Sequence, residues 1–154
     1  TTAKTDSYAQ SFLVLEDDVG RAQVLPRWRL MSWLSQASSC DRECPVSGVF
    51  LNSCDSEGIG RAFMEAGVPH VVCCRGQVFD SACKTFTRTF YRALAASRPV
   101  LAAFEVAREA VRCSTQPGLR TEADKFMLLP RREDILCSPR LSVTSVSRHC
   151  TATL

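Results

Sequence analysis

The segment that most constrains the fold is residues 46–58, which read Val-Ser-Gly-Val-Phe-Leu-Asn-Ser-Cys-Asp-Ser-Glu-Gly. The run from Val46 to Leu51 is almost entirely apolar, as is typical of a strand covered on both faces of a sheet. It is followed by Cys54 and by a loop that contains Gly58. In α/β proteins, reactive groups gather where the strands of a parallel sheet end. Cys54 is therefore the first candidate for a nucleophile.

Strands and helices are predicted to alternate along the chain. Strands are expected at residues 11–16, 46–51, 68–74 and 125–130, and helices at residues 26–37, 58–66, 80–94 and 99–111, with a loop at 113–124. Asp80 has the residue type that favours an N-cap, at the start of the third helix. No hairpin is predicted between these elements. The pattern therefore favours an α/β fold with a mostly parallel sheet and helices on both faces.

The length and charge of the chain limit its class. Its 154 residues correspond to one domain, which we assign to residues 11–130 between a loose lead-in (1–10) and a basic, Ser- and Thr-rich tail (131–154). The net charge of +3 is too small to indicate nucleic-acid binding. No apolar run is long enough for a membrane span, and no signal peptide is recognised. The chain does not start with Met, so we expect it to be a piece of a longer protein.

Nine cysteines are present, and several of them lie within apolar runs. Free cysteine behaves there as a small hydrophobic residue, so the pattern favours a reducing, cytoplasmic compartment over a disulfide scaffold. Cys40 and Cys44 have a spacing that suggests zinc, but no second pair stands at a supporting distance. We therefore expect neither a metal nor a cofactor.

Several stretches in a fixed order resemble the CHAT domain, a relative of the caspase-like cysteine peptidases. They are residues 46–58, residues 60–72 (Gly-Arg-Ala-Phe-Met-Glu-Ala-Gly-Val-Pro-His-Val-Val), residues 78–80 (Val-Phe-Asp), residues 86–94 (Phe-Thr-Arg-Thr-Phe-Tyr-Arg-Ala-Leu) and residues 102–108 (Ala-Ala-Phe-Glu-Val-Ala-Arg). The resemblance covers roughly residues 11–130 and implies a caspase-like three-layer sandwich that is incomplete at its N-terminal side.

The resemblance also implies a function. Cys54 matches the nucleophile of active members, which cleave peptide or protein substrates, and their base is a histidine in a His-x-x-Gly-His-Gly stretch expected upstream of Thr1. Asn52 stands where metacaspases carry an aspartate, so a preference for cleavage after Arg or Lys does not carry over. Family members often accompany tetratricopeptide repeats, which are expected in the parent chain. Because a strand would then be missing from the sheet, we expect the isolated chain to be poorly soluble.

Other residues have competing interpretations. Ser53 and Gly58 lie in the loop that would supply oxyanion contacts, and Asp55 and Asp80 are candidates for a specificity pocket, although Asp80 also suits a helix cap. His70 begins a strand whereas Cys54 follows one, so we expect the two to lie far apart. Two other functions stay open: a catalytically inactive CHAT-like signalling or scaffolding module, and a doubly wound hydrolase or ligand-binding domain unrelated to caspases.

Overall fold

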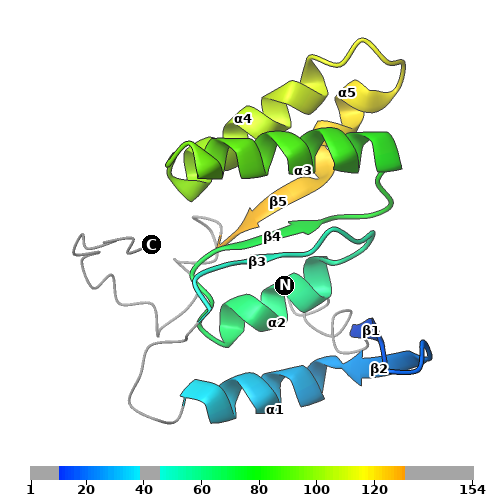
Figure 1. Cartoon of the computed structure of the whole chain (residues 1–154), viewed down its shortest axis with the longest axis vertical. Helices are drawn as coiled ribbons and strands as arrows, with labels where there is room; N and C mark the ends of the chain where they lie inside the picture. The colour runs from blue at the N-terminus through cyan, green and yellow to red at the C-terminus, as the bar shows by residue number, and fades with distance from the viewer. Residues whose placement is uncertain (1–10, 39–45, 131–154) are drawn as a thin grey trace, which may run out of the picture.

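The computed structural model describes residues 11–38 and 46–130 (Figure 1). The elements are, in chain order, β1 (Phe12–Glu16), β2 (Ala22–Pro26), α1 (Arg27–Ser38), β3 (Val49–Phe50), α2 (Glu57–Glu65), β4 (Val71–Cys74), α3 (Asp80–Ala95), α4 (Val100–Arg112), α5 (Leu119–Glu122), the 3-10 turn η2 (Ala123–Lys125) and β5 (Phe126–Leu129). Mixed α/β architecture is confirmed. Cys40, Cys44 and the two predicted terminal segments lie outside the described residues.

The central sheet has the strand order β3-β4-β5. β3 runs parallel to β4, but β5 runs antiparallel to it, with Val71 opposite Leu129. We predicted a mostly parallel sheet, but the described sheet has one parallel and one antiparallel pair of strands. The reason lies in the connection, because two helices, α3 and α4, separate β4 from β5. The first returns along the sheet and the second reverses again, so β5 starts beside the carboxyl end of β4.

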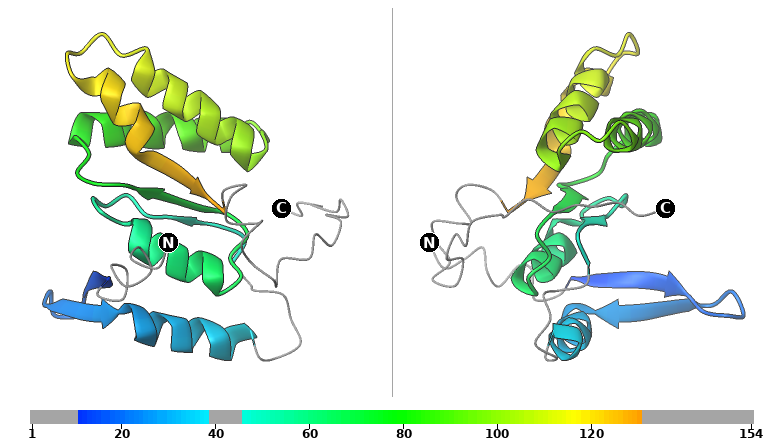
Figure 2. Two further views of the ribbon diagram at one scale, coloured as in Figure 1. Left: turned by 180° about the vertical axis from the view of Figure 1, so that it is seen from behind. Right: turned by 60° about the vertical axis from the view of Figure 1, so that its left-hand side comes forward.

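Helices cover both faces of this sheet (Figure 2). Side chains of β4 alternate between two cores, as the pleat of a strand requires. Val72 and Cys74 pack with the apolar residues of α3 and α4, whereas Val71 and Cys73 belong to the core on the side of α2. All four β4 residues are buried. The near-continuous apolar sequence of β4 follows from this double coverage.

A separate β-hairpin, β1-β2, precedes α1, and sequence analysis did not predict it. Its turn is held by the carboxylate of Asp17, which accepts hydrogen bonds from the amides of Val19 and Arg21 at 3.0 and 2.7 Å. β2 gave little signal because only Leu25 among its residues is buried. Pro26, expected to start the helix, is instead the last residue of β2.

Three further expectations need correction. Residues 119–124 lie in a short helix and a 3-10 turn where a continuous loop was expected, and Lys125, expected to begin the last strand, ends that turn. The strands β3 and β4 are shorter than the apolar runs that predicted them. Asp80 is the first residue of α3 rather than its N-cap, which is Phe79, and no side-chain hydrogen bond caps this helix. Within residues 11–38 and 46–130, no helix is long and apolar enough to cross a membrane.

Candidate functional site

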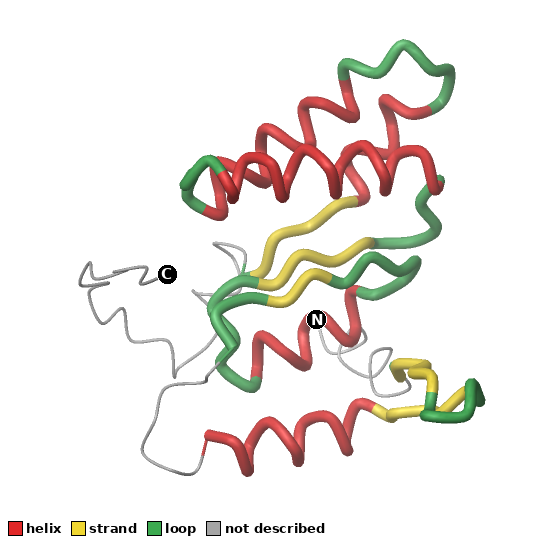
Figure 3. The backbone as a smooth tube through the Cα atoms, in the orientation of Figure 1, coloured by secondary structure: helices red, strands yellow, loops and turns green. Residues whose placement is uncertain are grey.

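Cys54 lies in the loop that follows β3, beside the loop that follows β4. Because the two strands are parallel, their carboxyl ends meet at the same edge of the sheet (Figure 3). The amide of Asp55 donates a hydrogen bond to the carbonyl of Gly76 at 2.9 Å. The Cys54 Sγ atom accepts one from the amide of Val78 at 3.4 Å and donates to the Val78 carbonyl at 3.8 Å. The backbone beyond β4 therefore fixes the position of the thiol.

The Cys54 thiol is exposed beside a hollow of about 410 Å³. One wall is the Cys54 loop, with Ser53, Cys54 and Asp55, and the opposite wall is β1. The remaining lining residues are Ser11, Phe12, Leu13, Val14, Leu51, Ser56 and Ile59. The hollow thus brings together Cys54, the acidic residue Asp55, three serines and a wall of apolar side chains. This combination of an apolar wall with a few polar groups is typical of binding sites.

The two acidic residues next to Cys54 lie in different environments. Asp55 lines the hollow, and its backbone is left-handed with φ of 52°. No hydrogen bond or ion pair joins its carboxylate to any residue that the structure describes. Glu57 is buried, and its carboxylate pairs with Arg61 and Arg75 at 3.0 and 2.8 Å. Of the two, only Asp55 is placed to meet a ligand in the hollow.

The two residues proposed for the oxyanion loop lie in different elements. Ser53 belongs to the loop, lines the hollow and donates to the Cys54 carbonyl at 3.4 Å. Gly58 is buried in the first turn of α2, and its carbonyl accepts a hydrogen bond from Arg27 at 2.8 Å. Amides in the first turn of a helix have no partner within the helix. The start of α2 therefore brings backbone donors close to the Cys54 loop.

Asp80 does not line the hollow. It lies at the exposed start of α3. Burial is the main cause of the raised pKa of Cys83, and the charges of Cys54 and Asp80 raise that pKa further. Burial raises the pKa of Cys74 to about 12, with smaller contributions from Cys83, Cys73 and Cys54. Cys74 and Cys83 therefore stay protonated near neutral pH, and Cys54 is the exposed thiol at this end of the sheet.

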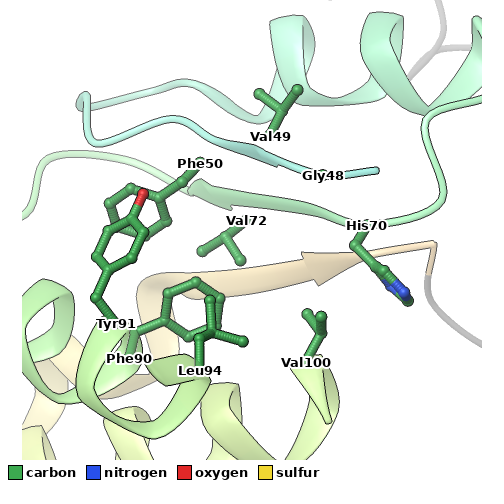
Figure 4. A pocket seen from close by; sticks show the side chains of 9 residues that line it. All are labelled: Gly48, Val49, Phe50, His70, Val72, Phe90, Tyr91, Leu94 and Val100. Carbon is green, nitrogen blue, oxygen red and sulfur yellow. The ribbon is translucent and has the colours of Figure 1, made fainter. Parts of the chain in front are cut away.

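His70 lies at the opposite end of the sheet from Cys54, as the parallel arrangement predicted. Its carbonyl accepts a hydrogen bond from the amide of Val49 at the start of β3, at 2.8 Å. The imidazole lines a second hollow of about 150 Å³, whose other walls are mostly apolar side chains of β3, β4 and α3 (Figure 4). His70 therefore does not serve as a base for Cys54.

Sequence reasoning missed two contributors to the site. Val78, which holds the thiol, comes 24 residues after Cys54. Phe12 and Val14, which line the hollow, belong to a strand that is expected from the sequence but was not assigned to the site. The resemblance to the CHAT domain included residues 78–80, but it gave Val78 no contact with Cys54. Within the described part of the chain, no cluster of three or more histidine, cysteine or acidic residues is arranged to hold a metal.

The described residues form a mixed α/β domain with an exposed thiol beyond the carboxyl end of a parallel pair of strands. The sequence model of the CHAT domain family matches residues 1–133. The match covers most of the chain, so the chain belongs to the CHAT domain family, and the predicted resemblance is confirmed. This membership relates it to the caspase-like peptidases. A comparison with curated proteins found no match.

Proposed function

We propose that this CHAT domain is part of a cysteine endopeptidase in which Cys54 is the nucleophile. The observation that carries the proposal is the exposed Cys54 thiol, held by the Val78 backbone and facing the hollow against β1. An N–H donor aimed at sulfur stabilises negative charge on it, and the thiolate is the reactive form of cysteine.

The chemistry follows the general scheme of covalent catalysis. The Sγ atom adds to a peptide carbonyl carbon, the C–N bond breaks, and the departing amine takes up the proton that the base removed from the thiol. Water then hydrolyses the thioester and restores the thiol. The base is proposed to be a histidine that precedes Thr1 in the parent polypeptide. Ser53 and the amides at the start of α2, including that of Gly58, are the proposed oxyanion donors.

The second edge of β1 pairs with no strand among the described residues, and this favours a peptide as the substrate. Ser11 forms a backbone hydrogen bond with Arg27, and Asp17 forms one with Arg21. The backbone amides and carbonyls of the odd-numbered residues of β1 therefore point towards β2. By the alternation of an antiparallel ladder, the amides and carbonyls of Phe12 and Val14 point the other way. An extended peptide can add to such an edge as a further strand and pass along the wall of the hollow towards Cys54.

Asp55 is the proposed specificity residue, because it lines the hollow and its carboxylate has no hydrogen-bond or ion-pair partner among the described residues. We expect it to favour a substrate with a basic side chain close to the cleaved bond. Asp80, the other candidate, lies outside the residues that line the hollow and is a weaker proposal.

The test uses the parent polypeptide and a biotinylated peptidyl acyloxymethyl ketone, which alkylates the nucleophile of cysteine peptidases. We expect rapid labelling of the wild type and of Cys113→Ala, and none of Cys54→Ala. Cys113 is a suitable control because it is an exposed thiol outside the hollow. Labelling of Cys54 no faster than of Cys113 would refute the proposal.

The alternative is a non-catalytic signalling or scaffolding module in which the hollow binds a partner without cleaving it. The coding sequence upstream of Thr1 discriminates the two, since only the peptidase needs a His-x-x-Gly-His-Gly stretch. Tetratricopeptide repeats in the parent chain are proposed in either case. The free thiols of Cys54, Cys74, Cys83 and Cys113 support a reducing compartment such as the cytoplasm.

A further inference from the structure

Glu122 is a buried acidic residue that takes no part in the site described above. It belongs to α5, far along the chain from Cys54, and only 3% of its surface is exposed. Its Oε2 atom accepts a hydrogen bond from the amide of Phe79 at 3.0 Å, and its Oε1 atom pairs with Lys125 at 2.6 Å. A carboxylate is rarely buried unless its environment compensates the cost of losing water.

Lys125 extends the same contact to the neighbouring backbone. Its ammonium group donates to the carbonyl of Gln77 at 2.7 Å and lies 5.8 Å from the centre of the Phe79 ring. Glu122 and Lys125 thus hold residues on both sides of Val78. Val78 in turn places its own amide 3.4 Å from the Cys54 sulfur.

We infer that Glu122, with Lys125, is a positioning residue that keeps the Val78 amide directed at the Cys54 thiol. The chain of contacts runs from the Glu122 carboxylate through the Phe79 amide to the Val78 amide and the sulfur. Glu122 acts through the backbone and does not touch the reacting atoms. The inference deepens the role proposed for Cys54 as a nucleophile, since the oriented amide favours the thiolate.

Hydrogen bonding and charge make opposite predictions for Glu122. A negative charge near a thiol disfavours the thiolate, so a purely electrostatic Glu122 would slow Cys54, and its removal would speed alkylation. If Glu122 positions the loop, its removal slows alkylation, because the Val78 amide is then no longer held against the Cys54 sulfur. Glu122→Gln keeps an oxygen that can accept from Phe79, whereas Glu122→Ala removes it.

The experiment measures the rate of alkylation of Cys54 by iodoacetamide in the parent polypeptide, from pH 6 to 9, by peptide mass spectrometry. We expect Glu122→Ala to slow Cys54 about three- to tenfold at pH 7, the worth of one hydrogen bond, and to move the midpoint of the pH profile upward. Glu122→Gln should stay within about twofold of the wild type. Faster or unchanged alkylation of Glu122→Ala, or equal slowing of both variants, would overturn the inference.

The surroundings make the pH profile interpretable. The raised pKa values of Cys74 and Cys83 keep both thiols protonated over most of this range. Buried Cys73 and Cys74 report on folding, since they should stay unlabelled in a folded variant. If Glu122→Ala does not fold, Glu122→Asp replaces it: the charge remains but the shorter side chain no longer reaches Phe79, so slowing supports positioning and a wild-type rate refutes it.

The assay is independent of peptide hydrolysis. A failure of the ketone labelling together with slowed alkylation in Glu122→Ala would refute the peptidase and retain the positioning role. Normal ketone labelling together with an unchanged alkylation rate in Glu122→Ala would retain the peptidase and refute the positioning role.

Discussion

The hydroxyl oxygen of Ser56 accepts a hydrogen bond from the backbone amide of Cys74 at 2.9 Å. In a parallel ladder extended by one more step, the Cys74 amide would instead donate to the carbonyl of Leu51. The hydroxyl lies 3.4 Å from that carbonyl and donates to the carbonyl of Ser53 at 2.7 Å. Ser56 therefore lets the chain leave β3 and turn towards Cys54 without leaving a buried amide unpaired.

Replacement of Ser56 by alanine should destabilise the domain by about 1–3 kcal/mol, because the buried Cys74 amide loses its acceptor. Urea denaturation followed by circular dichroism measures this loss. Ser35→Ala is the matched control, since Ser35 is exposed and bonds only within α1. Equal effects of the two substitutions would contradict the structural role of Ser56.

Gly60 brings α2 close to the sheet. A Cβ atom at this position would lie 2.9 Å from the sulfur and 3.0 Å from the Cβ of Cys73, and 3.5 Å from a Leu129 methyl group. Gly60→Ala therefore forces α2 and β4 apart, and we expect a loss of about 1–3 kcal/mol although alanine favours helices. Thermal unfolding provides the measurement.

A double-mutant cycle tests the cause of that loss. Cys73→Ala removes the sulfur that the added methyl group meets first. The Gly60→Ala and Cys73→Ala double variant should therefore lose less stability than the sum of the two single variants, by about 0.5 kcal/mol or more. Strict additivity would mean that the close approach to Cys73 does not limit residue 60.

Cys74 makes stability depend on pH in the alkaline range. Burial raises its pKa from 9.0 to about 12, so the folded state holds the proton more tightly than the unfolded state. The resulting stabilisation is complete below about pH 9 and is lost as the pH rises towards 12, with a slope of up to about 1.4 kcal/mol per pH unit. Urea denaturation at pH 8, 9 and 10 should show a steeper decline for the wild type than for Cys74→Ala. Parallel curves would show that Cys74 does not control this decline.

Val14 lies on β1, whose second edge pairs with no strand that the structure describes, and 58% of its surface is exposed. Lysine on an open edge discourages pairing with another chain. Val14→Lys should therefore reduce the light scattering of the concentrated chain, while unfolding stays within about 0.5 kcal/mol of the wild type. Val106→Lys on α4 adds the same charge at an exposed position away from any sheet edge. An equal improvement in both variants would attribute the effect to net charge alone.

Local patterns predicted the elements with strong periodicity. The helical spacing of Phe86, Phe90 and Leu94 indicated α3. Continuous apolar runs indicated β3 and β4, because strands that are covered on both faces carry apolar residues at every position. The direction of β5 depends on how α3 and α4 pack and has no local signature. β2 escaped prediction because most of it is exposed, and exposed strands tolerate polar residues such as Gln23.

The candidate site was predicted only in part, for the same reason. Cys54 followed from its place after an apolar run. Its contacts with Val78 and with the wall formed by β1 depend on segments that meet only in the folded chain. A pattern within one stretch of sequence carries no information about such a meeting.

The sequence of β4, Val-Val-Cys-Cys, gives each face of the strand one valine and one cysteine. A shift of the strand by one residue exchanges the two faces, and hydrophobic patterning usually forbids it. Here the exchange would leave the polarity of both faces nearly unchanged. The side chains of β4 therefore cannot by themselves select its alignment. Contacts outside the β4 side-chain pattern fix the alignment instead. The carbonyl of His70 accepts a hydrogen bond from Val49 at one end, the amide of Arg75 donates to Lys125 at the other, and Gly60 packs closely on Cys73.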